Sequence, residues 1–174
     1  MTVGESAIVA GIVFVAVLLQ ATIFASLDVL GGTPDVLLLA LLGIALLRGA
    51  VTGAVAGFSG GLLLDIVTLD TLGVTALVLA LAGYWTGRYG ETTGRGRAHA
   101  PILSVIVLTI LVAVLGFFLH FLLGEEVSMR RALVEALLAG LGLNLIFGGP
   151  VFALCRALLE RGGSHRPAEV KLLG

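Results

Sequence analysis

Long apolar runs constrain this chain more than any other feature. Runs close to the length of a membrane span recur along its 174 residues, and short polar gaps separate them. In lipid every backbone polar group must bond within the protein, so spanning segments are helices or closed barrels. Barrel strands would alternate in polarity over about ten residues, whereas these runs are continuous and rich in Leu, Val, Ala and Gly. The chain is therefore predicted to be an all-α membrane protein.

Composition excludes several classes of function. Only 12% of the residues are charged, about half the share found in soluble domains. The net charge of −1 gives no electrostatic reason to expect a nucleic-acid partner. Cys155 is the single cysteine, so no disulfide can form within the chain. We expect no cofactor and no metal, because the three histidines lack ligand spacing and no cofactor motif is present.

Six transmembrane helices are expected in one domain covering residues 1–174. The first run lacks a basic leading segment and is longer than a signal-peptide core, so it is interpreted as a retained span. Thr33-Pro34-Asp35 predicts a helix start, with a cap, a proline in the first turn and a carboxylate near the positive helix end. The predicted spans are 7–27, 34–47, 51–69, 72–89, 101–123 and 132–159, followed by a basic tail at 160–174.

The basic residues predict the direction of insertion. With six spans, Arg130 and Arg131 lie on one side of the membrane. The other side receives Arg48, Arg88, Arg95, Arg97, Arg156, Arg161, Arg166 and Lys171. Both termini are therefore expected in the cytoplasm, and the basic groups would contact anionic lipid or an acidic partner. A five-span alternative fuses the second and third spans, moves the N-terminus outside and leaves Arg48 in hydrocarbon at a cost of about 2.5–3.5 kcal/mol.

Glycines at four-residue spacing predict close helix contacts. Gly53, Gly57 and Gly61 form one stripe on the third span, and Gly83 and Gly87 repeat the spacing on the fourth. Stripes of small residues let helices approach closely in lipid. Two interpretations stay open: the glycines pack spans within the chain, or some of them seat a partner helix.

Polar residues inside the apolar runs are the candidates for a site, because such groups are costly in lipid unless they are paired. Asp65 either bonds backbone and fixes a helix break near residues 68–70, or it faces a cavity or partner. Under the six-span prediction most candidates share the outer half of the bundle, which suggests a polar region open to the outside. The candidates are Gln20, Asp35, Asp65, His120, Glu135 and Asn144.

One sequence pattern suggests catalysis. Gly57-Phe58-Ser59-Gly60-Gly61 matches the nucleophile-elbow pattern and the shorter pattern of rhomboid intramembrane proteases, with His120 as a base. Ser59 would lie about 12 Å into its span and His120 about 28 Å into its own, measured from the inner side. A base must lie within about 3 Å of the hydroxyl it activates. A non-enzymatic role is therefore favoured.

The order of short segments within residues 34–88 carries a family resemblance. The segments are Pro34-Asp35-Val36-Leu37-Leu38-Leu39, Gly53-x-x-x-Gly57-Phe58, Gly61-Leu62-Leu63-Leu64-Asp65, Leu72-Gly73, Ala76-Leu77 and Gly83-Tyr84. This order resembles the MreD family of rod shape-determining membrane proteins. The first, fifth and sixth spans are similar to that family in hydropathy alone.

The resemblance implies a non-enzymatic subunit of the bacterial cell-elongation (rod) complex, in the cytoplasmic (inner) membrane. It implies direct binding of MreC and, through MreC, contact with MreB, RodA and a class B penicillin-binding protein during lateral peptidoglycan synthesis. The family is also similar to the S-components of energy-coupling-factor transporters, which are six-span bundles. That likeness implies an alternative: a small-molecule-binding transporter subunit with a pocket around Asp65, His120 and Glu135.

Overall fold

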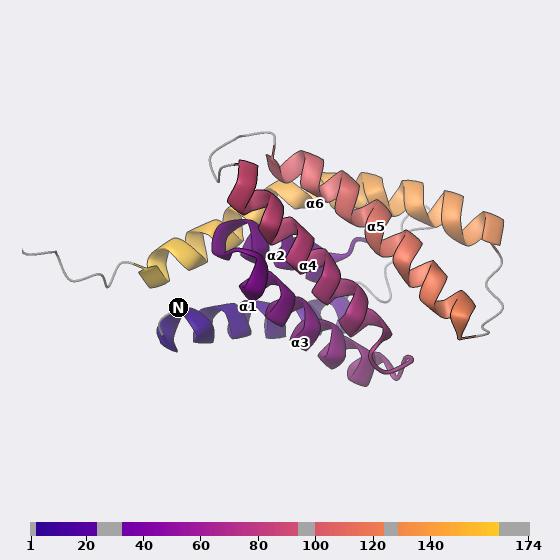
Figure 1. Cartoon of the computed structure of the whole chain (residues 1–174), viewed down its shortest axis with the longest axis horizontal. Helices are drawn as coiled ribbons and strands as arrows, with labels where there is room; N and C mark the ends of the chain where they lie inside the picture. The colour runs from indigo at the N-terminus through magenta and orange to yellow at the C-terminus, as the bar shows by residue number, and fades with distance from the viewer. Residues whose placement is uncertain (1–2, 24–32, 94–99, 124–128, 164–174) are drawn as a thin grey trace, which may run out of the picture.

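The computed structural model describes residues 3–23, 33–93, 100–123 and 129–163, which form six helices and no strand (Figure 1). The all-α prediction is confirmed. The helices are α1 (Val3–Thr22), α2 (Val36–Arg48), α3 (Ala50–Thr68), α4 (Val74–Thr93), α5 (Ala100–Leu122) and α6 (Met129–Gly163).

The helix boundaries differ from the predicted spans by a few residues, and two of these differences are informative. The first helix starts at Val3 rather than at residue 7, because Glu5 in its first turn pairs with Arg48. Residues 24–27 of the predicted first span lie outside the described residues. The fourth helix continues to Thr93, and Glu91 in this extension accepts a hydrogen bond from the first amide of α3.

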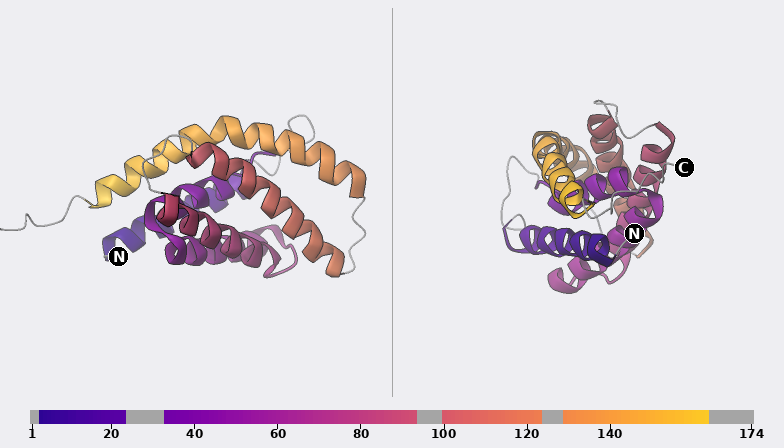
Figure 2. Two further views of the ribbon diagram at one scale, coloured as in Figure 1. Left: turned by 45° about the horizontal axis from the view of Figure 1, so that its top comes forward. Right: turned by 90° about the vertical axis from the view of Figure 1, so that its left-hand side faces the viewer.

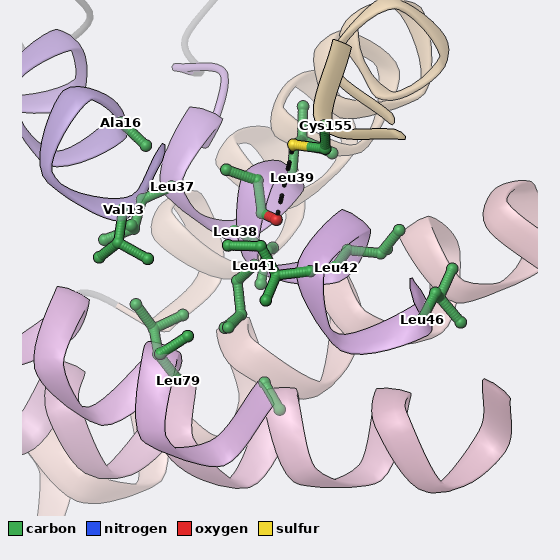
Figure 3. Packing of buried hydrophobic residues seen from close by; sticks show 14 of the residues in the cluster. Val13, Ala16, Leu37, Leu38, Leu39, Leu41, Leu42, Leu46, Leu79 and Cys155 are labelled. Carbon is green, nitrogen blue, oxygen red and sulfur yellow. Dashed lines mark hydrogen bonds between the residues drawn. The ribbon is translucent and has the colours of Figure 1, made fainter. Parts of the chain in front are cut away.

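The short helix α2 forms the centre of the bundle. All its residues from Val36 to Leu46 are buried, and α2 contacts each of the other five helices. A helix that is apolar on every side is buried in lipid or in protein, and here the neighbouring helices enclose it. Figure 3 shows its leucines packed against side chains of α1 and α4, with Cys155 Sγ of α6 lying 3.9 Å from the Ala40 carbonyl oxygen.

A glycine reverses the chain between α2 and α3. Gly49 has φ +95°, a backbone conformation that residues other than glycine rarely adopt. Beyond it, Gly53 packs against Ala45 and Gly60 packs against Leu37, so α2 and α3 run antiparallel. The alternative that fuses the second and third spans into one helix is therefore wrong.

Contacts across the bundle fix the direction of the other helices. α2 and α6 run parallel, since Asp35 bonds Asn144 at one end while Arg48 bonds the Leu159 carbonyl at the other. α1 runs antiparallel to α2, because Glu5 also pairs with Arg48 and the opposite end of α1 reaches the start of α2. These directions agree with a chain that crosses a membrane repeatedly, in which successive helices run in opposite directions.

Four of the helices are long and apolar enough to cross a membrane: α1, α3, the Ile102–Leu119 stretch of α5 and the Leu137–Glu160 stretch of α6. α2 has 13 residues, about 20 Å, against a hydrocarbon core of about 30 Å. Since other helices enclose α2, it can be shorter than a helix that crosses the bilayer in contact with lipid. Figure 2 shows α6 bent over the bundle, and Pro150 inside this helix accounts for a bend.

Candidate functional site

The start of α2 lies among side chains from other helices. The first amides of a helix have no partner within it, and here side chains supply the acceptors. The Asp35 N–H donates to Asn144 Oδ1 at 2.8 Å, and the Val36 N–H donates to Gln20 Oε1 at 2.8 Å. The Leu38 N–H donates to Asp35 Oδ1 at 2.9 Å. The predicted helix start is therefore displaced by two residues: α2 begins at Val36, Asp35 is its cap in place of Thr33, and α1 and α6 supply the other acceptors.

A fourth side chain extends this group to α5. Asn144 Nδ2 donates to Thr109 Oγ1 at 3.2 Å, and both residues are buried. We call Gln20, Asp35, Thr109 and Asn144 the α2-start cluster. Its residues come from α1, α5, α6 and the start of α2. The cluster lies about 20 Å, the length of α2, from the opposite end of that helix. Sequence reasoning missed Thr109, and the signal available was its hydroxyl within an otherwise apolar run.

A second polar group closes the opposite end of α2. Arg48 donates from Nη1 to Glu5 Oε1 at 2.5 Å and from Nη2 to the Leu159 carbonyl oxygen at 3.0 Å. Both side chains are only 18% exposed, and their pairing leaves neither as a buried charge without a partner. We call Glu5, Arg48 and the Leu159 carbonyl the Arg48 cluster. The two clusters mark the two ends of the central helix.

Asp65 belongs to neither cluster. Its Oδ2 accepts from the Gly73 N–H at 2.8 Å, and its backbone oxygen accepts from the Asp70 N–H at 3.1 Å. Between them Leu69 ends α3 in the left-handed conformation, at φ 57°. Asp65 is 1% exposed, and its Oδ1 has no hydrogen-bond partner among the described residues. The carboxylate therefore holds the turn between α3 and α4, as the backbone-bonding interpretation requires.

All five glycines of the two stripes lie where α3 packs against α4, and Gly53 and Gly83 face each other there. A Cβ added at Gly53 would lie 2.5 Å from the Gly83 carbonyl oxygen, and one at Gly61 would lie 2.6 Å from Ala76 Cα. A Cβ at Gly57 would overlap the Leu79 carbonyl, and one at Gly87 would overlap the backbone at Ala50. Packing within the chain therefore occupies these glycines.

The remaining candidates fall partly outside the description. His120 lies in α5 and Glu135 in α6, but their side chains lie outside the described residues. No group of three His, Cys, Asp or Glu side chains is placed to hold a metal ion within the described ranges. Of the residues in the predicted outward polar region, Gln20 lies in the α2-start cluster and Asp65 lies apart from it.

Comparison with known families identifies the chain. A family model for the rod shape-determining protein MreD matches residues 3–158, which include five whole helices and most of α6. The chain belongs to the MreD family. As an MreD family member with several long apolar helices, it is a membrane protein associated with rod shape. No curated protein and no solved structure matches the chain, so the likeness to transporter S-components gains no support.

Ser59, the serine of the nucleophile-elbow pattern, can be considered in the light of the family and of its hydrogen bond. MreD is a family of shape-determining proteins, and in this member Ser59 Oγ donates to the Ala56 carbonyl oxygen at 3.2 Å. Such bonding to the preceding turn is common for hydroxyl side chains within helices. Ser59 is exposed on the side of α3 that faces α1, which is a surface for packing.

Proposed function

We propose that this MreD family member is a non-enzymatic scaffold of the rod complex in the bacterial cytoplasmic membrane and that it binds MreC directly. The observation that carries the proposal is the MreD match over residues 3–158. The placement of the polar groups supports it: Gln20, Asn144 and Asp65 are used to bond the chain's own backbone. A bundle stabilised in this way offers its outer surfaces to other membrane proteins.

The groove between α1 and α3 is the surface that best fits a partner helix. It has a volume of about 260 Å³, and small or hydroxyl side chains make up much of its lining. In membranes such side chains allow close backbone approach and interhelical hydrogen bonds. The lining residues are Ser6, Val9, Ala10, Val13, Val51, Thr52, Val55, Ala56 and Ser59. We assign the membrane helix of MreC to this α1–α3 groove.

Binding of MreC would connect the bundle to the rest of the machinery. Through MreC the chain would contact MreB, RodA and a class B penicillin-binding protein, and so support lateral peptidoglycan synthesis. The whole chain would act as one transmembrane domain. The eight basic residues on one side against two on the other favour both termini in the cytoplasm.

Photocrosslinking in intact cells tests this proposal. A photoreactive amino acid at Ser59 should yield an adduct that contains MreC, identified by mass spectrometry after purification. The same group at Ala153, which is exposed on α6 outside the α1–α3 groove, is the matched control and should yield much less. Recovery of a transporter ATPase module in place of MreC would overturn the assignment and favour the S-component alternative.

A further inference from the structure

A second groove lies between α1 and α6, with α2 as its floor. Its volume is about 470 Å³, within the range of small-molecule sites. Bulky apolar side chains of Ile8, Ile12 and Leu19 form one wall, and those of Phe147, Leu154 and Leu158 form the other. Val36 and Ala40 of α2 contribute to the floor. We call this surface the α1–α6 groove.

The two polar clusters bound the groove at its ends. Leu19 is adjacent to Gln20 of the α2-start cluster, and Leu158 is adjacent to Leu159 of the Arg48 cluster. Ile8 lies about one turn beyond Glu5 of the same Arg48 cluster. Between these ends the lining residues are apolar or glycine, apart from Cys155, whose thiol lies against the Ala40 carbonyl oxygen, so the groove offers no free polar group to recognise a polar ligand.

The length of the groove matches one leaflet of a bilayer. Its walls extend from Ile8 to Leu19 on α1 and from Phe147 to Leu158 on α6, which is about 16 Å of helix. Half of a hydrocarbon core of about 30 Å is about 15 Å. A hydrocarbon chain that entered beside the Arg48 cluster would therefore fill the groove and end near the α2-start cluster.

The composition of the groove also distinguishes a lipid chain from a partner helix. Close helix contacts in membranes use small and hydroxyl side chains, as the α1–α3 groove does, whereas long branched and aromatic side chains dominate the α1–α6 groove. Gly11 and Ala16 are the small residues on the α1 wall, and a Cβ at Gly11 would meet open space. We infer that the α1–α6 groove binds one acyl chain of a membrane phospholipid, which stays with the protein after extraction.

The groove makes no charged contact of its own, so the site should select hydrocarbon and not headgroup. Phosphatidylethanolamine and phosphatidylglycerol should therefore bind alike. This property separates the site from a cluster of basic residues, which would favour the anionic lipid. The inference does not depend on MreC binding, and its failure would leave the proposed function untouched.

Native mass spectrometry of the full chain in mild detergent tests the inference. Wild-type protein should carry one phospholipid, and after delipidation it should rebind added phosphatidylglycerol and phosphatidylethanolamine equally. Gly11→Leu should lower the lipid affinity about tenfold, since its side chain would extend into the groove from a position where a Cβ meets no protein atom within 4 Å. Gly142→Leu is the matched control, because Gly142 also faces open space but does not line the groove.

A second variant and a measurement of folding show whether any loss of lipid binding is caused by misfolding. Leu154→Trp fills the groove from the opposite wall, where Leu154 is 60% exposed, and it should lower lipid binding as Gly11→Leu does. Thermal unfolding of both variants should match wild type. Unchanged lipid binding in both folded variants would overturn the inference. A strong preference for phosphatidylglycerol would also overturn it. The same holds if Gly11→Leu keeps its lipid but no longer binds MreC.

Discussion

Asn144 shows how a single polar residue can organise a membrane bundle. Its amide accepts from the Asp35 N–H and donates to Thr109, so one side chain of α6 ties α2 to α5. Sequence reasoning selects Asn144 because an amide within an apolar run must find a partner. It cannot say which partner, because the bonded residues Asp35 and Asn144 are 109 positions apart and only the fold brings them together.

Replacing Asn144 should destabilise the bundle. Asn144→Leu leaves the part-buried Asp35 N–H without its acceptor, which costs about 1–3 kcal/mol, and it should lower the midpoint of thermal unfolding in detergent. Thr109→Val leaves the buried Asn144 Nδ2 without this acceptor and should also destabilise the bundle, by about 1–3 kcal/mol. If Asn144→Leu unfolds at the wild-type temperature, the α2-start cluster does not stabilise the fold.

At the scale of helices, the pairing of α3 with α4 depends on glycine. The repeats reveal a stripe on each helix, and hydropathy with capping residues predicts where the helices lie. Spacing along one helix does not reveal what the stripe faces, so the sequence left packing and partner binding open. The structure sets Gly53 against Gly83 and Gly57 against Leu79. The central position of α2 was also hidden, although its short, wholly apolar run is consistent with enclosure.

Gly57→Leu should therefore act on folding. The new side chain would overlap the Leu79 carbonyl, and overpacking of this kind costs about 1–3 kcal/mol. Reduced thermal stability and reduced accumulation in the membrane are expected, while Gly142→Leu, which meets open space, should behave as wild type. A Gly57→Leu protein of normal stability that fails only to recover MreC would show instead that α3 seats the partner there.

For the whole molecule, alternating helix directions and the charge asymmetry lead to one topology. The hydrogen bonds at both ends of α2 fix α1, α2 and α6 relative to one another. The positive-inside rule then favours the end with the Arg48 cluster in the cytoplasm. α2 is apolar but short, and α4 carries Arg88 and Glu91, so length and hydropathy together mark only four of the six described helices as candidate spans.

Reporter fusions test this orientation. A reporter that is active only in the periplasm should be inactive at the N-terminus and at the C-terminus, and a cytoplasmic reporter should be active at both. The basic residues near the C-terminus, among them Arg156 and Arg161, account for the expected cytoplasmic position. Periplasmic activity at the N-terminus alone would require an odd number of crossings and would refute the six-crossing topology.

Quantitative recovery of MreC with groove-filling variants tests the scaffold proposal most directly. Wild type, Ala10→Phe and Ala153→Phe should be purified from the native host after crosslinking, with equal amounts of folded protein compared. Ala10 is exposed and lines the α1–α3 groove, whereas Ala153 is exposed outside it. We predict that Ala10→Phe recovers much less MreC and that Ala153→Phe recovers as much as wild type. Equal recovery with all three proteins would remove MreC from the α1–α3 groove, and absence of MreC from the wild-type sample would contradict the scaffold function itself.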